Sequence, residues 1–371
     1  MRKVCPQNER IKREYFTYLK EAKRASEAAV DKAAAAIARF EEYTKGGDFK
    51  RFHIRQATAF KAKLEATTSE RSGRPLSLAT VHQTLAALRA FFVWLAGQPG
   101  YRSKFTYADA DYFNLTEGKR RIATSSRDSV APTLEQIERV LAVMPNDTAI
   151  EKRDRAVIAF AILTGARDGA IASAKLKHVD LKLGRFRQDA REVKTKFSKS
   201  FDTTFFPVGG SAREIVSDWI AFLRQDQSWG DDDPLFPASR VEQVPATKQF
   251  EVVGLDRKHW SDAAPIRRIF HENFERAGLP YFNPHSFRKT LAVFGERICR
   301  TPEDFKAWSQ NLGHDGVLTT LQSYGTIPAH RQAEIIANLG NPNDQEAMKA
   351  KLGQFVEHFL RNQGSSPNPS I

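Results

Sequence analysis

The chain has 371 residues, 41% hydrophobic and 27% charged, which is enough for two domains that each bury their own core. Its 57 Lys and Arg residues against 44 Asp and Glu residues give a net charge of +13, which favours a polyanionic partner such as nucleic acid. Two cysteines, Cys5 and Cys299, exclude a disulfide framework and a zinc site of paired cysteines.

The sequence indicates no membrane partner. Its N-terminal residues contain no hydrophobic signal core. The most apolar run, residues 156–163, is too short to span a bilayer. We therefore expect a cytoplasmic, nucleoid-associated protein.

The first hundred residues have helical periodicity. Apolar residues recur at three- and four-residue spacing over about residues 8–40, with Ser26 as a candidate cap between two helices. After a further helical pattern, Ser77 is placed to cap a strongly apolar helix that continues to Leu95. We predict a helical domain over residues 1–97.

Residues 98–132 interrupt this periodicity. They begin with Gln-Pro-Gly and later contain a basic run, so we predict an interdomain linker. Three basic residues of the run, Lys119, Arg120 and Arg121, are candidates to lie along a phosphate backbone, although such a run is more often a solvated linker.

A second, mixed domain is predicted over residues 133–340. It begins with a capping box at Thr133, and its β-branched and aromatic segments on either side of a lysine cluster predict a small antiparallel sheet. The proline-punctuated region 229–260 gives no secondary-structure prediction. The tail, residues 341–371, is predicted to hold an amphipathic helix over residues 344–361 and a disordered end.

Five short motifs in the second domain carry reactive side chains. Three are helix ends or starts: Thr-Gly-Ala-Arg167, His285-Ser-Phe-Arg288 and Leu-Gly-His314. The other two are a lysine cluster between predicted strands and Tyr324, which follows a short apolar helix. Each motif alone has an ordinary explanation, such as a helix cap, a turn histidine or a packed amphipathic side chain.

Together the motifs fit attack on a phosphodiester, which requires a nucleophile, positive charge on the phosphate and a proton for the leaving oxygen. The arginine fork grips phosphate oxygens, and histidine exchanges protons near neutral pH. A phenol can act as the nucleophile, and a lysine on a mobile hairpin can donate to the leaving oxygen.

In chain order, these motifs resemble the tyrosine recombinase, or phage integrase, family over about residues 133–339. The resemblance implies a mainly α fold with a small antiparallel β-sheet: a helical core-binding domain that clamps DNA, then a mixed α+β catalytic domain. It also implies a covalent 3′-phosphotyrosine intermediate that needs neither ATP nor a metal or other cofactor. The implied partners are double-stranded DNA, a homo-tetramer on that DNA and accessory DNA-bending proteins.

The resemblance assigns the catalytic residues, which are Arg167, Lys196, His285, Arg288, His314 and Tyr324. Lys196 is chosen because Lys196 and Lys199 have the spacing of the family's hairpin lysines. Lys194 and Lys199 remain alternatives, since Lys194 and Lys196 would share one face of a strand.

The chain departs from the family pattern at three places. Ala170 stands where many members carry glutamate, and Ser286 stands where aspartate is common. The interval from His314 to Tyr324 is one residue longer than expected.

We predict a site-specific recombinase or integrase that cleaves and rejoins DNA. The alternatives are a type IB topoisomerase-like strand relaxase and a non-catalytic DNA-binding protein on a recombinase scaffold. The tail helix either packs on its own domain or docks on a neighbouring protomer. The sequence identifies neither the DNA target nor the direction of recombination.

Overall fold

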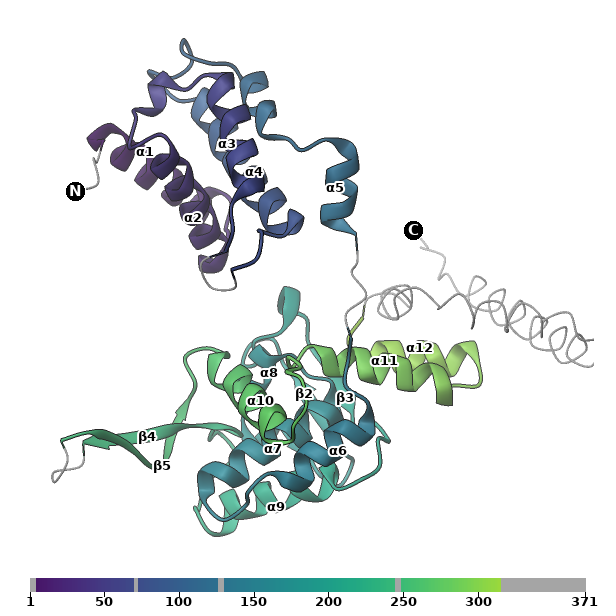
Figure 1. Cartoon of the computed structure of the whole chain (residues 1–371). Helices are drawn as coiled ribbons and strands as arrows, with labels where there is room; N and C mark the ends of the chain where they lie inside the picture. Colours follow the sequence, from purple (N-terminus) through teal and green to yellow (C-terminus); the bar gives the residue numbers. More distant parts are fainter. Residues whose placement is uncertain (1–4, 70–72, 126–129, 244–247, 315–371) are drawn as a thin grey trace, which may run out of the picture. The chain divides into compact units, whose positions relative to one another are not determined.

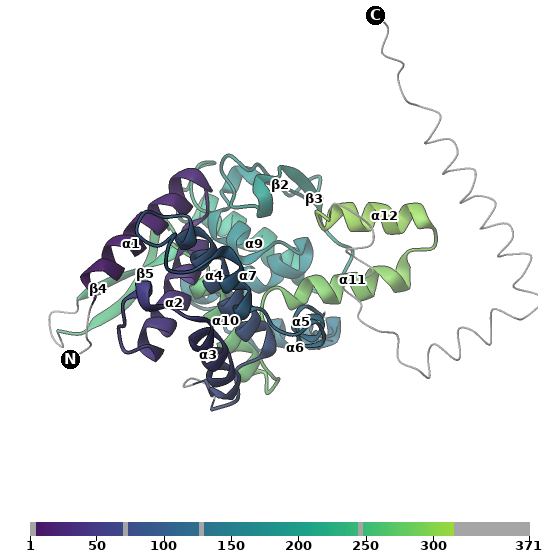
Figure 2. The ribbon, with the colours of Figure 1, turned by 90° about the horizontal axis from the view of Figure 1, so that it is seen from above.

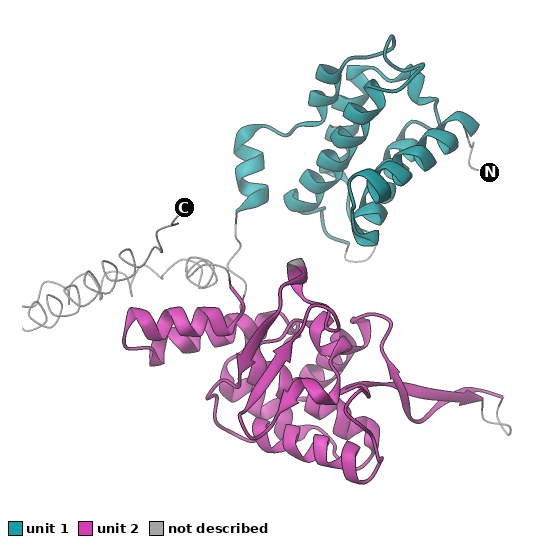
Figure 3. Ribbon diagram, turned by 180° about the vertical axis from the view of Figure 1, so that it is seen from behind, with its two compact units in different colours: residues 1–126 teal, residues 127–371 magenta. Residues whose placement is uncertain are grey.

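The computed structural model describes residues 5–69, 73–125, 130–243 and 248–314. The chain divides into two compact units, Met1–Ser126 and Arg127–Ile371 (Figure 3), and each has its own hydrophobic core. Most of the described secondary structure is helical, with two small antiparallel sheets (Figure 1). The predicted fold class is confirmed.

All the named elements in the described part of the first unit are helical. The predicted cap at Ser77 is confirmed, because its Oγ accepts the backbone N–H of Thr80 at 3.2 Å. The described elements, where η marks short 3₁₀ or π segments, are α1 (Pro6–Thr17), η1 (Tyr18–Ala22), α2 (Glu27–Tyr43), η2 (Phe49–Arg51), α3 (Ile54–Ala66), α4 (Leu78–Ala96), η3 (Tyr107–Phe113) and α5 (Glu117–Thr124).

Aromatic rings from several segments form the centre of this core. Phe113 lies 5.2 Å from Phe92 between ring centroids, and Phe105 lies 5.3 Å from Phe52. Phe105 and Phe113 come from the segment predicted as linker, so residues 98–125 belong largely to the first unit. The linker prediction was wrong here because these aromatics lie in irregular and 3₁₀ structure, which has no helical period.

Helix α4 is the one described helix with the length and hydropathy to cross a membrane. However, Val81, Leu85 and Leu88 on this helix are buried in the core of the first unit. This burial accounts for its apolar composition.

The second unit is built around α7, in which every residue from Ala156 to Thr164 is buried. Helices α6, α9, α10 and α11 all contact it. The described elements are α6 (Leu134–Val143), α7 (Ala149–Thr164), α8 (Asp168–Ser173), η4 (Leu176–His178), β1 (Val179–Asp180), β2 (Arg185–Gln188), η5 (Lys196–Ser198), β3 (Phe201–Thr204), α9 (Ala212–Gln225), β4 (Pro237–Gln243), β5 (Phe250–His259), α10 (Ala264–Arg276), α11 (Ser286–Ile298) and α12 (Pro302–Asn311).

The three-stranded sheet has the order β1-β2-β3 and is antiparallel, with Phe186 paired to Thr203. The lysine cluster lies between β2 and β3, as predicted. Strand β2 ends at Gln188, and β3 begins at Phe201. Lys194 and Lys196 therefore lie outside the strands, and the argument that they share a strand face does not apply.

Strands β4 and β5, in the region that gave no prediction, form an antiparallel hairpin with a register shift between Arg240 and Val241. The hairpin extends away from the rest of its unit (Figures 1 and 2). Val241, Val252 and Phe250 are all exposed on it. Because these exposed positions carry apolar residues, the strands lack the alternation of apolar and polar residues by which a half-buried strand is recognised in a sequence.

Candidate active site

A left-handed glycine ends α7 and sets the direction of the chain toward Arg167. Gly165 has φ of 57°, which favours glycine, and its N–H donates to Ala161 O at 2.9 Å. A Cβ atom at this position would lie 2.9 Å from Leu291 Cδ1 and 3.0 Å from Leu312 Cδ2. The turn is thus closely packed, and it holds Arg167 at the N-cap of α8.

Arg288 connects three segments that are distant in sequence. Its side chain is buried in the first turn of α11, where Nη1 donates to Gly165 O at 2.6 Å. Nη2 donates to Leu312 O at 2.5 Å and lies 2.8 Å from His314 Nε2. A guanidinium is only a donor, so His314 Nε2 accepts. The His-x-x-Arg motif, the first arginine's turn and the Leu-Gly-His motif therefore meet at one side chain.

His314 follows the predicted helix end. Helix α12 ends at Asn311, and Gly313 has φ of 67°. The N–H of Gly313 donates to Gln310 O at 2.7 Å, and the N–H of His314 donates to Ser309 O at 3.2 Å. These bonds satisfy carbonyls at the helix C-terminus and fix the backbone of His314.

Asn311 is a positioning residue that sequence reasoning missed. Its Oδ1 accepts the N–H of Thr204 at 2.7 Å, and its Nδ2 donates to Thr204 O at 2.7 Å. The Asn311 carbonyl also accepts the Thr203 hydroxyl at 3.1 Å. These bonds tie the end of α12 to β3. An asparagine at a helix end looks like an ordinary cap in the sequence, so no local signal identifies this long-range contact.

Positive charge surrounds His285, which immediately precedes α11. Partial desolvation, then the charges of Arg288 and Arg167, and to a smaller extent that of Lys196, lower its pKa from the ordinary value of 6.5, while Asp168 opposes this shift. Burial and, secondly, Arg167 lower the pKa of Arg288 to about 9, so the guanidinium stays charged at neutral pH. Because electrostatic effects weaken with distance, Arg167 and Lys196 lie close enough to His285 for their charges to act on it.

The two leading lysine candidates differ in their surroundings. The backbone N–H of Lys194 donates to Ser173 Oγ at 2.8 Å, and its Nζ lies 3.5 Å from Ser261 O. Lys196 begins η5, and its charge contributes to the lowered pKa of His285.

Two departures from the family pattern, Ala170 and Ser286, lie among the described residues, and both have a structural role. Ala170 is buried in the core of the second unit. Nearby, Asp168 Oδ2 accepts Arg267 Nε at 2.9 Å. Ser286 helps to start α11, because its hydroxyl donates to Asn283 O at 2.6 Å and its N–H donates to Asn283 Oδ1 at 3.1 Å.

The structure describes five of the six predicted catalytic residues, all but Tyr324. Tyr324 and the predicted tail helix, residues 344–361, lie outside the described residues. Within the described ranges, no three His, Cys, Asp or Glu side chains form a group that could hold a metal ion.

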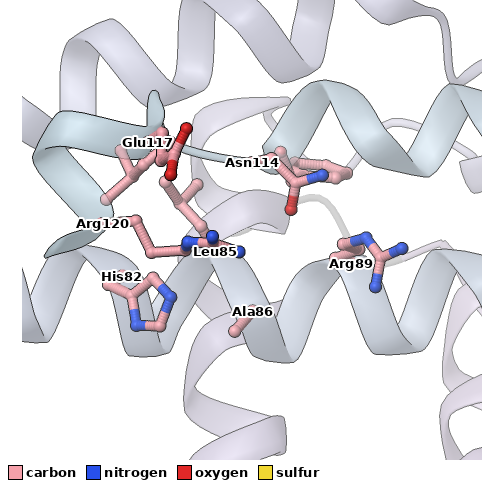
Figure 4. A pocket seen from close by; sticks show the side chains of 9 residues that line it. His82, Leu85, Ala86, Arg89, Asn114, Glu117 and Arg120 are labelled. Atoms are coloured by element: carbon pink, nitrogen blue, oxygen red, sulfur yellow. The ribbon is translucent and has the colours of Figure 1, made fainter. Parts of the chain in front are cut away.

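A pocket of about 430 Å³ lies on the first unit between α4 and α5 (Figure 4). Its polar lining includes His82 and Arg89 from α4, and Glu117 and Arg120 from α5. Arg89 Nε donates to Asp111 Oδ1 at 2.7 Å. The pocket thus presents more basic than acidic side chains.

The basic run predicted to follow a phosphate backbone lies on α5, and its members have different partners. Lys119 Nζ lies 2.8 Å from Glu65, and Arg121 Nη2 lies 2.6 Å from Glu117. Arg120 instead extends from α5 toward α4 in the pocket (Figure 4). Among the described residues, Arg120 is the member of this run without an acidic partner.

Comparisons with known proteins agree with this arrangement. The model of the phage integrase family matches residues 133–330. Tyrosine recombinase XerC of Ralstonia pickettii (strain 12J) is 26% identical over 274 residues, covering 71% of this chain and 74% of the relative. Tyrosine recombinase XerC of Escherichia coli O157:H7 is 24% identical over 266 residues, covering 71% of this chain and 75% of the relative.

Solved integrases share the fold. A lambda integrase dimer bound to a COC′ core site has a TM-score of 0.58 and 13% identity, covering 86% of this chain and 96% of that one. The Tn1549 transposon integrase in complex with transposon right end DNA has a TM-score of 0.54 and 12% identity, covering 89% and 99%. Because the family model matches more than half of its residues, this chain belongs to the phage integrase family, the tyrosine recombinases.

Proposed function

We propose that this chain is a site-specific DNA recombinase that cleaves and rejoins DNA through a covalent 3′-phosphotyrosine at Tyr324. The observation that carries the proposal is the set of hydrogen bonds from Arg288 to Gly165 O, Leu312 O and His314. These bonds support a shared role for three separate motifs in one site. Arg167 and Lys196 add positive charge that acts on His285.

The proposed reaction is a transesterification at one DNA phosphate. The oxygen of Tyr324 forms a bond to phosphorus while the bond to the 5′-oxygen breaks. Neutral His285 accepts the tyrosine proton, and Lys196 donates a proton to the leaving 5′-oxygen. Arg167 and Arg288 stabilise the charge on the non-bridging oxygens.

Rejoining reverses these steps. A 5′-hydroxyl attacks the phosphotyrosine, and the tyrosine leaves with its proton restored. Because each bond broken is replaced by an equivalent phosphoester bond, the exchange requires no external energy source. When the attacking hydroxyl belongs to a second duplex, the strands are exchanged.

We propose double-stranded DNA as the partner and a homo-tetramer as the assembly on it. Support comes from the net charge of +13 and from the pocket on the first unit. It also comes from lambda integrase, which has been solved as a tetramer bound to a Holliday junction. The accessory DNA-bending proteins stay a prediction.

The decisive experiment is to trap a covalent complex on a nicked duplex and to map the modified residue by mass spectrometry. We expect the adduct on Tyr324. Tyr324→Phe should bind duplex DNA with nearly unchanged affinity and form no adduct, because only the nucleophilic oxygen is lost. Tyr281→Phe, at an exposed tyrosine, is the matched control and should cleave normally.

An adduct on any residue other than Tyr324 would contradict the proposed nucleophile. A second assay separates recombination from strand relaxation. A recombinase joins two target sites into recombinant products, whereas a relaxase changes only the supercoiling of a plasmid.

A further inference from the structure

A buried histidine lies beside the chain that joins β2 to β3, residues 189–200, which we call the lysine segment. His178, at the end of η4, is 4% exposed, and its Nε2 lies 2.8 Å from Glu192 Oε2. Its Nδ1 accepts the backbone N–H of Lys175 at 3.0 Å. Because Nδ1 is the acceptor, Nε2 carries hydrogen and donates to Glu192. The proposed reaction uses neither His178 nor Glu192.

Two lysines that neighbour His178 in the chain also contact Glu192. Lys177 Nζ donates to its Oε1 at 2.9 Å, and Lys175 Nζ lies 3.6 Å from that oxygen. Hydrogen bonds from Lys177 and then His178 lower the pKa of Glu192 to about 2, so the carboxylate is ionised at neutral pH. Glu192, near the start of the lysine segment, is therefore held by the side chains of Lys175, Lys177 and His178.

Two adjacent contacts hold the same end of the lysine segment. Val193 is buried in the core, and the N–H of Lys194 donates to Ser173 Oγ at 2.8 Å. Ser173 ends α8, and Arg167 caps the beginning of that helix. The first arginine and the start of the lysine segment are thus attached to opposite ends of one short helix.

We infer that Glu192, held by His178, is a positioning residue that aims Lys196 at the leaving 5′-oxygen; the inference rests on the proposed function. Lys196 lies four residues after Glu192, so the direction of the chain at Glu192 determines where the lysine arrives. A misplacement of about 1 Å can slow catalysis about 100-fold. Arg167 and His285 immediately precede α8 and α11, and Arg288 lies in α11, so their placement does not depend on this carboxylate.

The test uses the full chain and two nicked duplexes, one with the normal 5′-bridging oxygen and one with sulfur there. A 5′-thiolate leaves readily without a proton, so only lysine-dependent cleavage of the oxygen substrate should suffer. We expect Glu192→Ala to slow cleavage of the oxygen substrate about 10- to 100-fold and to cleave the sulfur substrate at close to the wild-type rate. Glu192→Gln keeps an acceptor for His178 and should recover part of the lost rate.

Asp232→Ala is the matched control. Asp232 pairs with the same Lys175 and Lys177, but it lies outside the lysine segment. It should behave like wild type on both substrates. If Glu192→Ala is equally slow on oxygen and sulfur, or slow on neither, Glu192 does not position the lysine and the inference is overturned.

A measurement without catalysis separates this inference from the proposed function. If the wild-type chain cleaves neither duplex, the proposed function fails. Amide hydrogen exchange then still tests whether Glu192 holds the lysine segment. Exchange over residues 194–200 should be faster in Glu192→Ala than in wild type, while α7 and α11 stay protected. Unchanged exchange in residues 194–200 would overturn the positioning role.

Discussion

Arg288 Nη2 donates a hydrogen bond to His314 Nε2 over 2.8 Å, and Arg288 Nη2 also donates to the carbonyl of Leu312. The first turn of α11 and the turn after α12 are therefore joined by one buried side chain. Loss of the guanidinium would leave buried carbonyls without donors, which is costly. The site and the local fold depend on the same contacts.

The first prediction concerns Arg288→Lys, which keeps the charge but cannot span Gly165 O and Leu312 O with a planar fork. We expect cleavage to fall about 100-fold or more. The free energy of unfolding should fall by about 1–3 kcal/mol. Single-turnover adduct formation and chemical denaturation measure these effects. Arg297→Lys, at an exposed position of the same helix, is the control and should be neutral.

The second prediction concerns Gly165→Ala. The left-handed φ of 57° and the close approach of Leu291 and Leu312 both oppose a Cβ atom. We expect the free energy of unfolding to fall by about 1–3 kcal/mol, and cleavage to slow because Gly165 carries a carbonyl that Arg288 binds. Gly118→Ala, with no atom within 4 Å of its Cβ, is the control and should be neutral or slightly stabilising. Equal unfolding curves for the two variants would refute this prediction.

The third prediction concerns the protonation of His285 in the DNA-free chain. Its pKa is lowered chiefly by desolvation and then by Arg288 and Arg167, so the imidazole should titrate below 6.5. Arg167→Ala should raise this pKa, because it removes a neighbouring positive charge. Asp168→Asn should lower it, because the opposing carboxylate is lost. NMR titration of the imidazole protons measures both shifts, and shifts of the same sign in the two variants would contradict this account.

This pKa also sets the sign of the pH dependence of cleavage. Neutral His285 is the proposed proton acceptor, so the cleavage rate should fall as pH drops through its pKa. The rate should become insensitive to His285 well above 6.5, because the lowered pKa leaves the imidazole neutral there.

The fourth prediction concerns the basic run on α5. Arg120 lines the pocket, whereas Arg121 is paired with Glu117. If Arg120 contacts a phosphate, Arg120→Ala should weaken duplex binding equally on all sequences and reduce the slope of log K against log salt by about 1. Arg121→Ala should change the slope less. Binding isotherms at several salt concentrations test this, and equal slopes for wild type and Arg120→Ala would exclude the contact.

Local signals made much of this fold predictable. The capping box at Thr133 and the cap at Ser77 are both present, because short-range backbone donors determine helix starts. Helix ends were predicted at the motifs that contain Gly165 and Gly313, and both glycines have the left-handed backbone that glycine tolerates. The candidate residues Arg288 and His314 were found from motif order, and the structure brings them into contact.

Long-range contacts were not predictable from the same signals. The pairing of Asn311 with Thr204 joins residues 107 positions apart, and nothing in either local sequence specifies it. The pairing of His178 with Glu192 likewise joins η4 to the lysine segment. The burial of Phe105 and Phe113 depends on packing against distant helices. In each case the tertiary partner, rather than local periodicity, decides the role of the residue.

The last prediction separates the two leading lysine candidates. Lys194 is anchored through its backbone to Ser173, and its Nζ lies 3.5 Å from Ser261 O. The charge of Lys196 does act on His285. We therefore expect Lys196→Ala to slow cleavage of normal DNA about 10²–10⁴-fold, the range of a lost general acid.

Lys196→Ala should cleave the 5′-bridging sulfur substrate at close to the wild-type rate, because a thiolate leaves without a proton. Lys194→Ala should cleave both substrates nearly normally, and Arg167→Ala should be slow on both, because its charge acts on the phosphate rather than on the leaving group. Selective rescue of Lys194→Ala in place of Lys196→Ala would assign the general acid to Lys194. Lys194 and Lys196 are only two residues apart. The sulfur substrate distinguishes them, because only the lysine that protonates the leaving oxygen becomes dispensable.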